Sequence, residues 1–355
     1  MAGFVMMAGL TSCSDDDDEE GTEDNYTTYQ KAVDAQVQAG KKHNKAILLV
    51  AFGSTWQQAF TAFDNTKKSY ETRFTDYDVY VSYSSAICIN RAAQGEHQAD
   101  GAEVRNYYAP NFWLHAFGTA KYDEILVQSL QVIPGEEFNR VINYLKDFAN
   151  NYLGDLDDTY LSKVTLKLGA PLLTSNEGAN NDVEATAKAL DAYCNKQSGQ
   201  GIVAFMGHGN PNGFDSYKAN VRYTELEEAL QEINPNYFVG TVDMPDNYKN
   251  NVLDRMHAAG FTEGNIYLYP LMSIAGDHAH NDMAGEGDDY WDASEPASEE
   301  NSWYEYFAHN NFVPTSNLLG LLEIPGVLNI WMQHTQDAVN SEGLEDYYHS
   351  MFPEE

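Results

Sequence analysis

The chain has 355 residues, 43 % of them apolar, which gives enough length and apolar surface for the cores of two ordinary domains. Acidic side chains outnumber basic ones by 54 to 20, and the formal net charge of −34 argues against nucleic acid or an anionic membrane as the main partner. Much of the acidic excess lies at residues 14–24 and 277–300, where we expect a solvated tail and a solvated loop.

The N-terminus resembles the signal peptide of a bacterial lipoprotein. A short apolar stretch, AGFVMMAGL, leads through small residues to Cys13, and it is too short to cross a bilayer as a helix. The resemblance implies that residues 1–13 carry the signal, that Cys13 is lipidated, and that the protein is exported to the periplasm or the outer-membrane surface. Because no Lys or Arg precedes the apolar part, an upstream start codon and a plain apolar tail stay open.

Residues 14–43 read as an acidic tether and a leader, with a short helix as one reading of 26–43. The acidic run after Cys13 resembles a tag for export to the outer face of the outer membrane, with a flexible spacer as the alternative. Beyond the tether only Cys88 and Cys194 remain, so neither a disulfide framework nor a thiolate metal site is expected. No later segment is apolar for long enough to cross a membrane.

Apolar runs alternate with helically spaced segments along the rest of the chain. Strands separated by helices predict parallel sheets with helices on both faces, in two similar α/β units. We place the domains at 44–170 and 171–355. In the first we expect strands at 45–53, 76–84, 123–133 and 163–173, helices at 55–74 and 134–153, and helix broken by loop at 85–120.

The second unit repeats this alternation. We expect a long polar loop between Asp277 and Tyr306, either a lid over the site or a surface insertion. A closing helix near 324–340 is expected to pack back across the other domain. The remaining predicted elements are helices at 180–198, 222–233 and 246–260 and strands at 201–206, 236–243 and 265–274.

Three side chains that bind transition metals follow successive predicted strands. His208, Asp243 and His278 are spaced 35 residues apart, each where an apolar run meets a turn. The carboxyl ends of parallel strands converge on one rim of a sheet, so these side chains are expected to meet. Imidazole and carboxylate together suit Co, Fe, Ni or Zn. A lone histidine after a strand is usually a surface or capping residue, but two with a carboxylate between them favour a metal site.

The acidic loop that follows His278 offers further polar side chains. His280 is either an additional ligand or points away, because only Ala279 separates it from His278. Asp277 and Asp282 would either orient imidazole N–H groups or be solvated.

Several segments resemble the sirohydrochlorin cobaltochelatases of the anaerobic cobalamin pathway, which are ATP-independent class II chelatases. The resemblance covers most of residues 44–340. It implies two Rossmann-like domains around a central cleft for the tetrapyrrole, with His208, Asp243 and His278 as metal ligands and His208 as the base. The substrate metal would be Co²⁺, with Fe²⁺ or Ni²⁺ as alternatives. The matching segments are AILLVAFGST, VQSLQVIPGEEF, LGAPLLTS, FMGHGNP, VGTVD and YPLMSIAGDHAHNDMAGEGDDYW.

The chain departs from the family pattern at two positions. Asp243 stands where the family usually has Glu, which shortens the reach by one methylene and could change the preferred metal. Gln131 stands where the family usually has His, which removes one titratable group near the cleft.

The tetrapyrrole that the resemblance implies is a polycarboxylate, so cationic or N–H-donating groups must line its cleft. The helix N-termini after Ser54 and Thr55 and after Ser84 and Ser85 would provide such donors. Arg91 is the nearby cation. The large negative net charge opposes the approach of a polyanion unless the local potential reverses it.

Two functions compete. The first is a chelatase that inserts Co²⁺ into sirohydrochlorin. The second is an exported lipoprotein that binds haem, another tetrapyrrole or the metal, or removes metal from the ring, since sirohydrochlorin is made in the cytoplasm and a lipoprotein faces outward. A homo-oligomer stays open.

Overall fold

The computed structural model describes residues 23–99, 101, 104–177, 181–215, 217–286, 297–298 and 300–343. The predicted signal segment with Cys13, the acidic run as far as residue 22 and the middle of the acidic loop lie outside this part of the chain. Within it, no helix is both long enough and apolar enough to cross a membrane.

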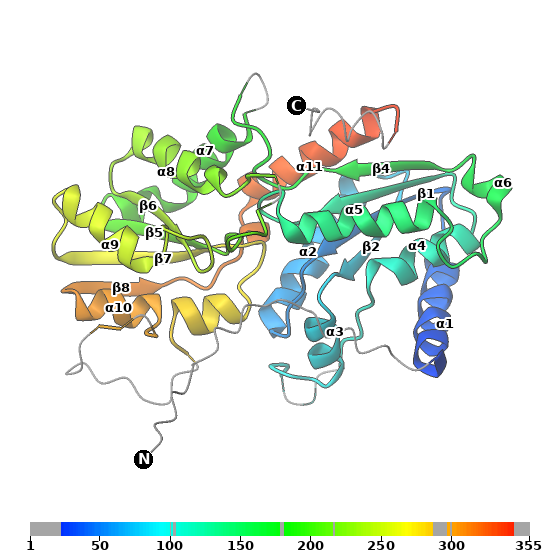
Figure 1. Cartoon of the computed structure of the whole chain (residues 1–355), viewed down its shortest axis with the longest axis horizontal. Helices are drawn as coiled ribbons and strands as arrows, with labels where there is room; N and C mark the ends of the chain where they lie inside the picture. Colours follow the sequence, from blue (N-terminus) through cyan, green and yellow to red (C-terminus); the bar gives the residue numbers. More distant parts are fainter. Residues whose placement is uncertain are drawn as a thin grey trace, which may run out of the picture.

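Two four-stranded parallel sheets form the centre of the molecule, which confirms the predicted α/β class (Figure 1). The first sheet has the order β2-β1-β3-β4 and the second the order β6-β5-β7-β8. The strands are β1 (Lys45–Ala51), β2 (Asp78–Tyr83), β3 (Glu124–Ser129), β4 (Thr165–Gly169), β5 (Ile202–Gly207), β6 (Tyr237–Thr241), β7 (Gly264–Leu271) and β8 (Phe312–Ser316).

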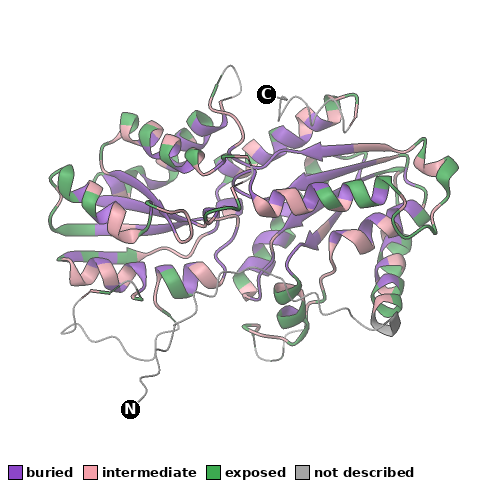
Figure 2. Cartoon of the chain, viewed as in Figure 1, coloured by how far each residue is buried: buried purple, intermediate pink, exposed green. Residues whose placement is uncertain are grey.

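Helices flank both sheets, and Figure 2 shows that their outward faces are exposed while the strands are buried. In the first half the helices are α1 (Glu23–Gly40), α2 (Gln57–Arg73), α3 (Ala86–Ala93), α4 (Pro110–Thr119), α5 (Glu136–Ala149) and α6 (Asp158–Leu161). In the second half they are α7 (Asp182–Ser198), α8 (Val221–Ile233), α9 (Lys249–Ala258), the π-helix η2 (His278–Met283), α10 (Trp303–His309), the 3₁₀ turn η3 (Leu321–Glu323) and α11 (Pro325–Asn340).

The central strand β1 shows why a continuous apolar run becomes a strand buried on both faces. Ile47 and Leu49 point into the core shared with α2, whereas Leu48 and Val50 point into the core shared with α4 and α5. All four side chains are fully buried. Burying each of them contributes about 1.5–3 kcal/mol, and the two-sided burial fixes which residues reach the end of the strand.

Strand β8 was missed in the sequence, and the loop predicted at 277–306 was wrong at both ends. Residues 278–283 form the π-helix η2, and α10 begins at Trp303. The sequence FVPTS contains Pro314, which usually argues against a strand because it cannot donate a ladder hydrogen bond. β8 tolerates it because it is the edge strand of its sheet.

The predicted closing helix is α11, which packs against β3 and β4 of the first sheet and against α7 of the second half. Its indole side chain Trp331 is fully buried and donates from Nε1 to the carbonyl oxygen of Gln131 at 3.3 Å. One turn later, Thr335 donates to Gln128 Oε1 in β3 at 2.7 Å. The helix therefore ties the end of the chain to the first sheet.

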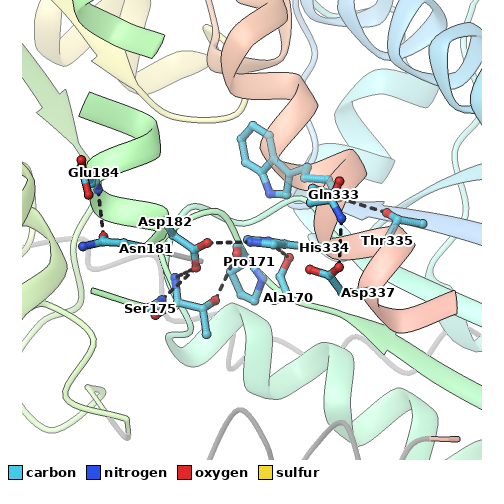
Figure 3. A network of polar contacts seen from close by, with 12 residues as sticks. Ala170, Pro171, Ser175, Asn181, Asp182, Glu184, Gln333, His334, Thr335 and Asp337 are labelled. Atoms are coloured by element: carbon cyan, nitrogen blue, oxygen red, sulfur yellow. Dashed lines mark hydrogen bonds and ion pairs between the residues drawn. The ribbon is translucent and has the colours of Figure 1, made fainter. Parts of the chain in front are cut away.

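A buried ion pair lies at the junction of the two halves (Figure 3). His334 Nε2 in α11 lies 2.9 Å from Asp182 Oδ1, at the start of α7. The other oxygen of Asp182 accepts from the backbone N–H groups of Thr174 and Ser175 in the linker. Burial alone would lower the pKa of His334, but its hydrogen bond to Asp182 and the charge of that carboxylate outweigh burial and raise the pKa.

We predict that this pair makes the fold more stable at mildly acidic than at alkaline pH. A raised imidazole pKa in the folded state gives stability that is complete below the ordinary value of 6.5 and is lost as the pH rises through the folded-state value. His334→Gln should cost about 1–3 kcal/mol at pH 6 and much less at pH 9. Denaturant melts at both pH values measure this, with the exposed His257→Gln as control; an equal loss at both would contradict it.

Candidate functional site

A cleft of about 380 Å³ lies between the two halves at the carboxyl ends of the strands. Segments that follow six strands, β1, β2, β3, β5, β6 and β7, contribute its lining. This is where a parallel α/β sheet places its ligands, because the strand ends leave a crevice there. His208, Asp243 and His278 all line it, so the structure brings together the three side chains expected at one rim.

The loops after β5 and β6 are joined by backbone hydrogen bonds that set the places of His208 and Asp243. The N–H of Asp243 donates to the carbonyl oxygen of His208 at 2.8 Å. Gly209 makes this possible, because it has φ +82° and a Cβ atom there would lie 2.8 Å from the backbone nitrogen of Met244. Only glycine combines that conformation with that close approach.

The three side chains face one another across short distances. His208 Nε2 lies 3.7 Å from Asp243 Oδ2. The rings of His208 and His278 meet edge to face with centroids 4.9 Å apart. His208 Nδ1 lies 2.8 Å from the carbonyl oxygen of Gly209 and donates to it, so in the neutral ring Nε2 carries the lone pair that faces Asp243.

His278 is oriented by its own partner, since its Nδ1 lies 2.5 Å from Asp282 Oδ2. Such a carboxylate raises the basicity of an imidazole and fixes the orientation of its ring. Within the described part of the chain, no three His, Cys, Asp or Glu side chains are already arranged to hold a metal ion. The three side chains are therefore adjacent but do not form a preformed metal site.

Glu137 is a site residue that the sequence reasoning missed. It lies in the first turn of α5, lines the cleft from the first half and is half-buried. Burial raises the pKa of its carboxyl above the ordinary value, and the charges of His208, Arg140 and His278 lower it only in part. The PGEE segment contains this carboxylate, but paired acids at a helix start also interact favourably with the helix dipole, so they do not by themselves indicate a site.

Two of the segments that carry the family resemblance meet across the cleft. Asn210, from GHGNP, places its Oδ1 3.4 Å from the backbone nitrogen of Glu136, in PGEE. A Cβ atom on Gly135 would lie 2.4 Å from Asn210 Oδ1, so any larger residue there would have to displace the Asn210 side chain. This contact sets the start of α5, and with it Glu137, opposite the His208 loop.

The residues expected to bind the tetrapyrrole divide into two groups. Ser54, Thr55, Ser85 and Arg91 line the cleft. Ser84 does not: it is buried, and its backbone N–H donates to the carbonyl oxygen of Ala51 at 2.9 Å.

All four already have polar partners: Ser54 Oγ accepts from the backbone N–H of Trp56 at 3.2 Å, and the hydroxyl oxygen of Thr55 lies 2.8 Å from Nδ1 of His97. Ser85 caps α3 by accepting from the N–H of Cys88 at 3.3 Å. Arg91 is half exposed and lies 3.7 Å from Asp277 and 3.6 Å from Glu96, distances that leave its guanidinium able to turn toward a ligand.

Two further residues lie at or near the cleft. The indole of Trp56 has one face covered by the ring of His97, with centroids 4.1 Å apart, and the other by the ring of His280, with centroids 3.5 Å apart, so neither face is open to the ring of a ligand. Gln131 lines the cleft and is buried, and its Nε2 has no hydrogen-bond partner among the described residues. An acceptor on a ligand would satisfy it.

Comparison with solved structures shows the same fold elsewhere. SirB from Bacillus subtilis with Fe³⁺ superimposes with a TM-score of 0.52 at 16 % identity, covering 84 % of this chain and 97 % of that chain. The sirohydrochlorin chelatase SirB from Bacillus subtilis subspecies spizizenii, in complex with cobalt, gives a TM-score of 0.51 at 14 % identity with the same coverage. At these identities the likeness concerns the fold alone.

Sequence comparison gives the relationship. The sirohydrochlorin cobaltochelatase CbiKC of Nitratidesulfovibrio vulgaris is 26 % identical over 299 residues, 84 % of this chain and 91 % of the relative. The sirohydrochlorin cobaltochelatase of Salmonella typhimurium is also 26 % identical over 299 residues, 83 % of this chain and 97 % of the relative. The family model described as cobalt chelatase (CbiK) matches residues 45–340. Since that match spans most of the chain, the protein belongs to the cobalt chelatase (CbiK) family.

Proposed function

We propose that this protein inserts Co²⁺ into sirohydrochlorin. The observation that carries the proposal is the meeting of His208, Asp243 and His278 in one cleft, opposite Glu137, in a chain of the CbiK family. Two curated relatives are sirohydrochlorin cobaltochelatases, and a SirB structure of the same fold holds cobalt. Fe²⁺ and Ni²⁺ are the alternative substrate metals, since the same donor set suits them.

Insertion demands two things of the site. The ion must pass from protein ligands to the four ring nitrogens, and two pyrrole N–H protons must leave, so that M²⁺ plus the free ring gives the metal complex plus two protons. A shell of two imidazoles and one carboxylate is incomplete and leaves positions for ring nitrogen. A trio that is adjacent but not preformed suits an ion that must be released.

The proton acceptors in this proposal are His208 and Glu137. The Nε2 lone pair of His208 faces the cleft side occupied by Asp243 and can take a pyrrole proton. Glu137, whose carboxyl pKa is raised by burial, can take another or pass it on. His208, His278 and Asp243 hold the ion first, and Nε2 of His208 takes a proton only after the ion has passed to the ring. The backbone bond to His208 brings the shorter Asp243 close.

For the tetrapyrrole carboxylates we propose the N-terminus of α2 after Ser54 and Thr55, the N-terminus of α3 at Ser85, and Arg91. These donors lie in the first half of the chain, whereas the metal trio lies in the second. The ring would therefore bind between them with its carboxylates on one side and its nitrogens toward the trio.

The proposed base is tested by His208→Ala. We expect kcat/KM for cobalt insertion to fall about 100-fold or more, because a base and a ligand are lost together. Anaerobic absorbance assays with sirohydrochlorin and Co²⁺ measure it. His257→Ala, an exposed histidine outside the cleft, should keep the wild-type rate. A His208→Ala enzyme as fast as the wild type would refute the proposed role.

Glu137→Gln tests the proposed role of the Glu137 carboxylate as a proton acceptor. The amide keeps the size but cannot accept a proton, so we expect the rate to fall about tenfold or more. The thermal midpoint should hold or rise, since a half-buried carboxyl with a raised pKa is replaced by a neutral group. Glu136→Gln is the matched comparison and should lose less, because that carboxylate already pairs with Arg140 at 3.2 Å. Equal, unreduced rates in both variants would contradict the assignment.

We also propose that the protein is an exported lipoprotein anchored at Cys13. Support comes from the apolar stretch and small residues before that cysteine. This location favours the second candidate function, a lipoprotein that binds haem or another tetrapyrrole, or removes its metal. Haem titration and release of metal from cobalt sirohydrochlorin would distinguish it from insertion.

The anchor predicts incorporation of labelled fatty acid into the wild-type protein in cells, and none into Cys13→Ser. The wild type should sediment with membranes while the variant is found in the soluble fraction. An unlabelled wild type in the soluble fraction would contradict the anchor.

A further inference from the structure

Trp56 joins the two halves of the cleft at its edge. It follows the loop after β1 and occupies the N-cap position of α2 in the first half. Its backbone N–H donates to Ser54 Oγ at 3.2 Å. From there its indole Nε1 donates to Asp277 Oδ1 in the second half at 2.6 Å. The flat face of the indole stacks on the imidazole of His280, with centroids 3.5 Å apart and planes 1° from parallel.

These two contacts bracket His278. Asp277 immediately precedes it, and His280 follows two residues later in the same π-helix, η2. His280 is buried, and its Nδ1 lies 2.6 Å from Glu286 Oε2. The indole contacts Asp277 before His278 and His280 after it. The position of the His278 imidazole therefore depends on the position of Trp56. π-Helices are rare and are found mostly at functional sites, where they redirect a side chain.

The second face of the indole is also held. His97 stacks on it with centroids 4.1 Å apart and planes 18° from parallel, and its Nδ1 lies 2.8 Å from the hydroxyl oxygen of Thr55. His97 has φ +54°, a left-handed backbone conformation that non-glycine residues rarely adopt. The unusual conformation at the far face indicates that the stack of His97, Trp56 and His280 is specified by the fold.

The loops behind the stack are closely apposed as well. A Cβ atom on Gly276 would lie 3.6 Å from Ser54 Oγ, so the loop after β7 touches the loop after β1. Two segments far apart in the sequence, AFGST and SIAGDH, therefore meet at the point where Trp56 spans the cleft. Neither face of the indole is available to a ligand, and its one N–H is used.

We propose that Trp56 is a positioning residue for the metal site: by holding Asp277 and His280 it fixes η2 so that His278 faces His208. The inference rests on the proposed function only in taking His208 and His278 as ligands of the substrate metal. Partners that orient a ligand without touching the ion affect metal affinity about 10–100-fold when they are removed. The indole N–H to a carboxylate is a charge-assisted bond, and the parallel stack adds a directional contact that leucine cannot supply.

The test uses the full-length mature protein with Trp56→Leu and Trp56→Phe. Titration with Co²⁺ alone, followed by the visible absorption of bound Co²⁺, reports the metal site without any tetrapyrrole. We expect the dissociation constant for Co²⁺ to rise about tenfold or more in Trp56→Leu and by less in Trp56→Phe, which keeps a stacking ring but loses the N–H. Initial rates should show a raised KM for Co²⁺ and an unchanged KM for sirohydrochlorin.

Trp113→Phe is the matched control, because Trp113 is a buried tryptophan of the first half, on α4, that does not line the cleft. Wild-type Co²⁺ affinity in Trp56→Leu would overturn the proposal. If that variant does not fold, Trp56→Phe decides: a loss of Co²⁺ affinity supports the proposal and wild-type affinity overturns it. A wild-type protein that binds Co²⁺ but converts no sirohydrochlorin would refute the proposed function while leaving the Trp56 titration interpretable.

Discussion

The arrangement of the site depends on holding two parallel sheets with their carboxyl ends toward one cleft. Helix α11 provides much of this constraint, because it belongs to the second half by sequence and packs on β3 and β4 of the first. Its buried Trp331 donates to the carbonyl oxygen of Gln131 after β3, and its His334 pairs with Asp182, which holds the linker between the halves.

In the proposed mechanism the site must both hold an ion and release it. His208 and Asp243 are linked through the backbone, whereas His278 belongs to a π-helix that is in contact with Trp56 across the cleft. The relative positions of His208 and Asp243 are therefore fixed within the second half. The position of His278 also depends on contacts between the two halves. A tetrapyrrole bound between the halves would lie next to the contact between Trp56 and η2. Its binding could therefore change the position of His278 relative to the ion.

Much of this could be predicted from the sequence, for physical reasons. Buried parallel strands appear as continuous apolar runs, and their ends converge, so His208, Asp243 and His278 could be brought together before any coordinates. The role of Glu137 could not be predicted, because an acid at a helix start usually serves only to stabilise the helix through its dipole. Strand β8 was not predicted because it contains Pro314. Ser84 and Ser85 are adjacent and identical in type, so the sequence could not show that only Ser85 lines the cleft.

The central claim is that the ion passes from the trio to the ring, and single-turnover transfer tests it most directly. Protein loaded with one equivalent of Co²⁺ is mixed anaerobically with sirohydrochlorin and an excess of a chelator that traps free cobalt, and absorbance follows the ring. Direct transfer predicts conversion of the ring with an amplitude matching the bound cobalt, and no conversion in His208→Ala. No conversion once free cobalt is trapped would contradict direct transfer from the cleft.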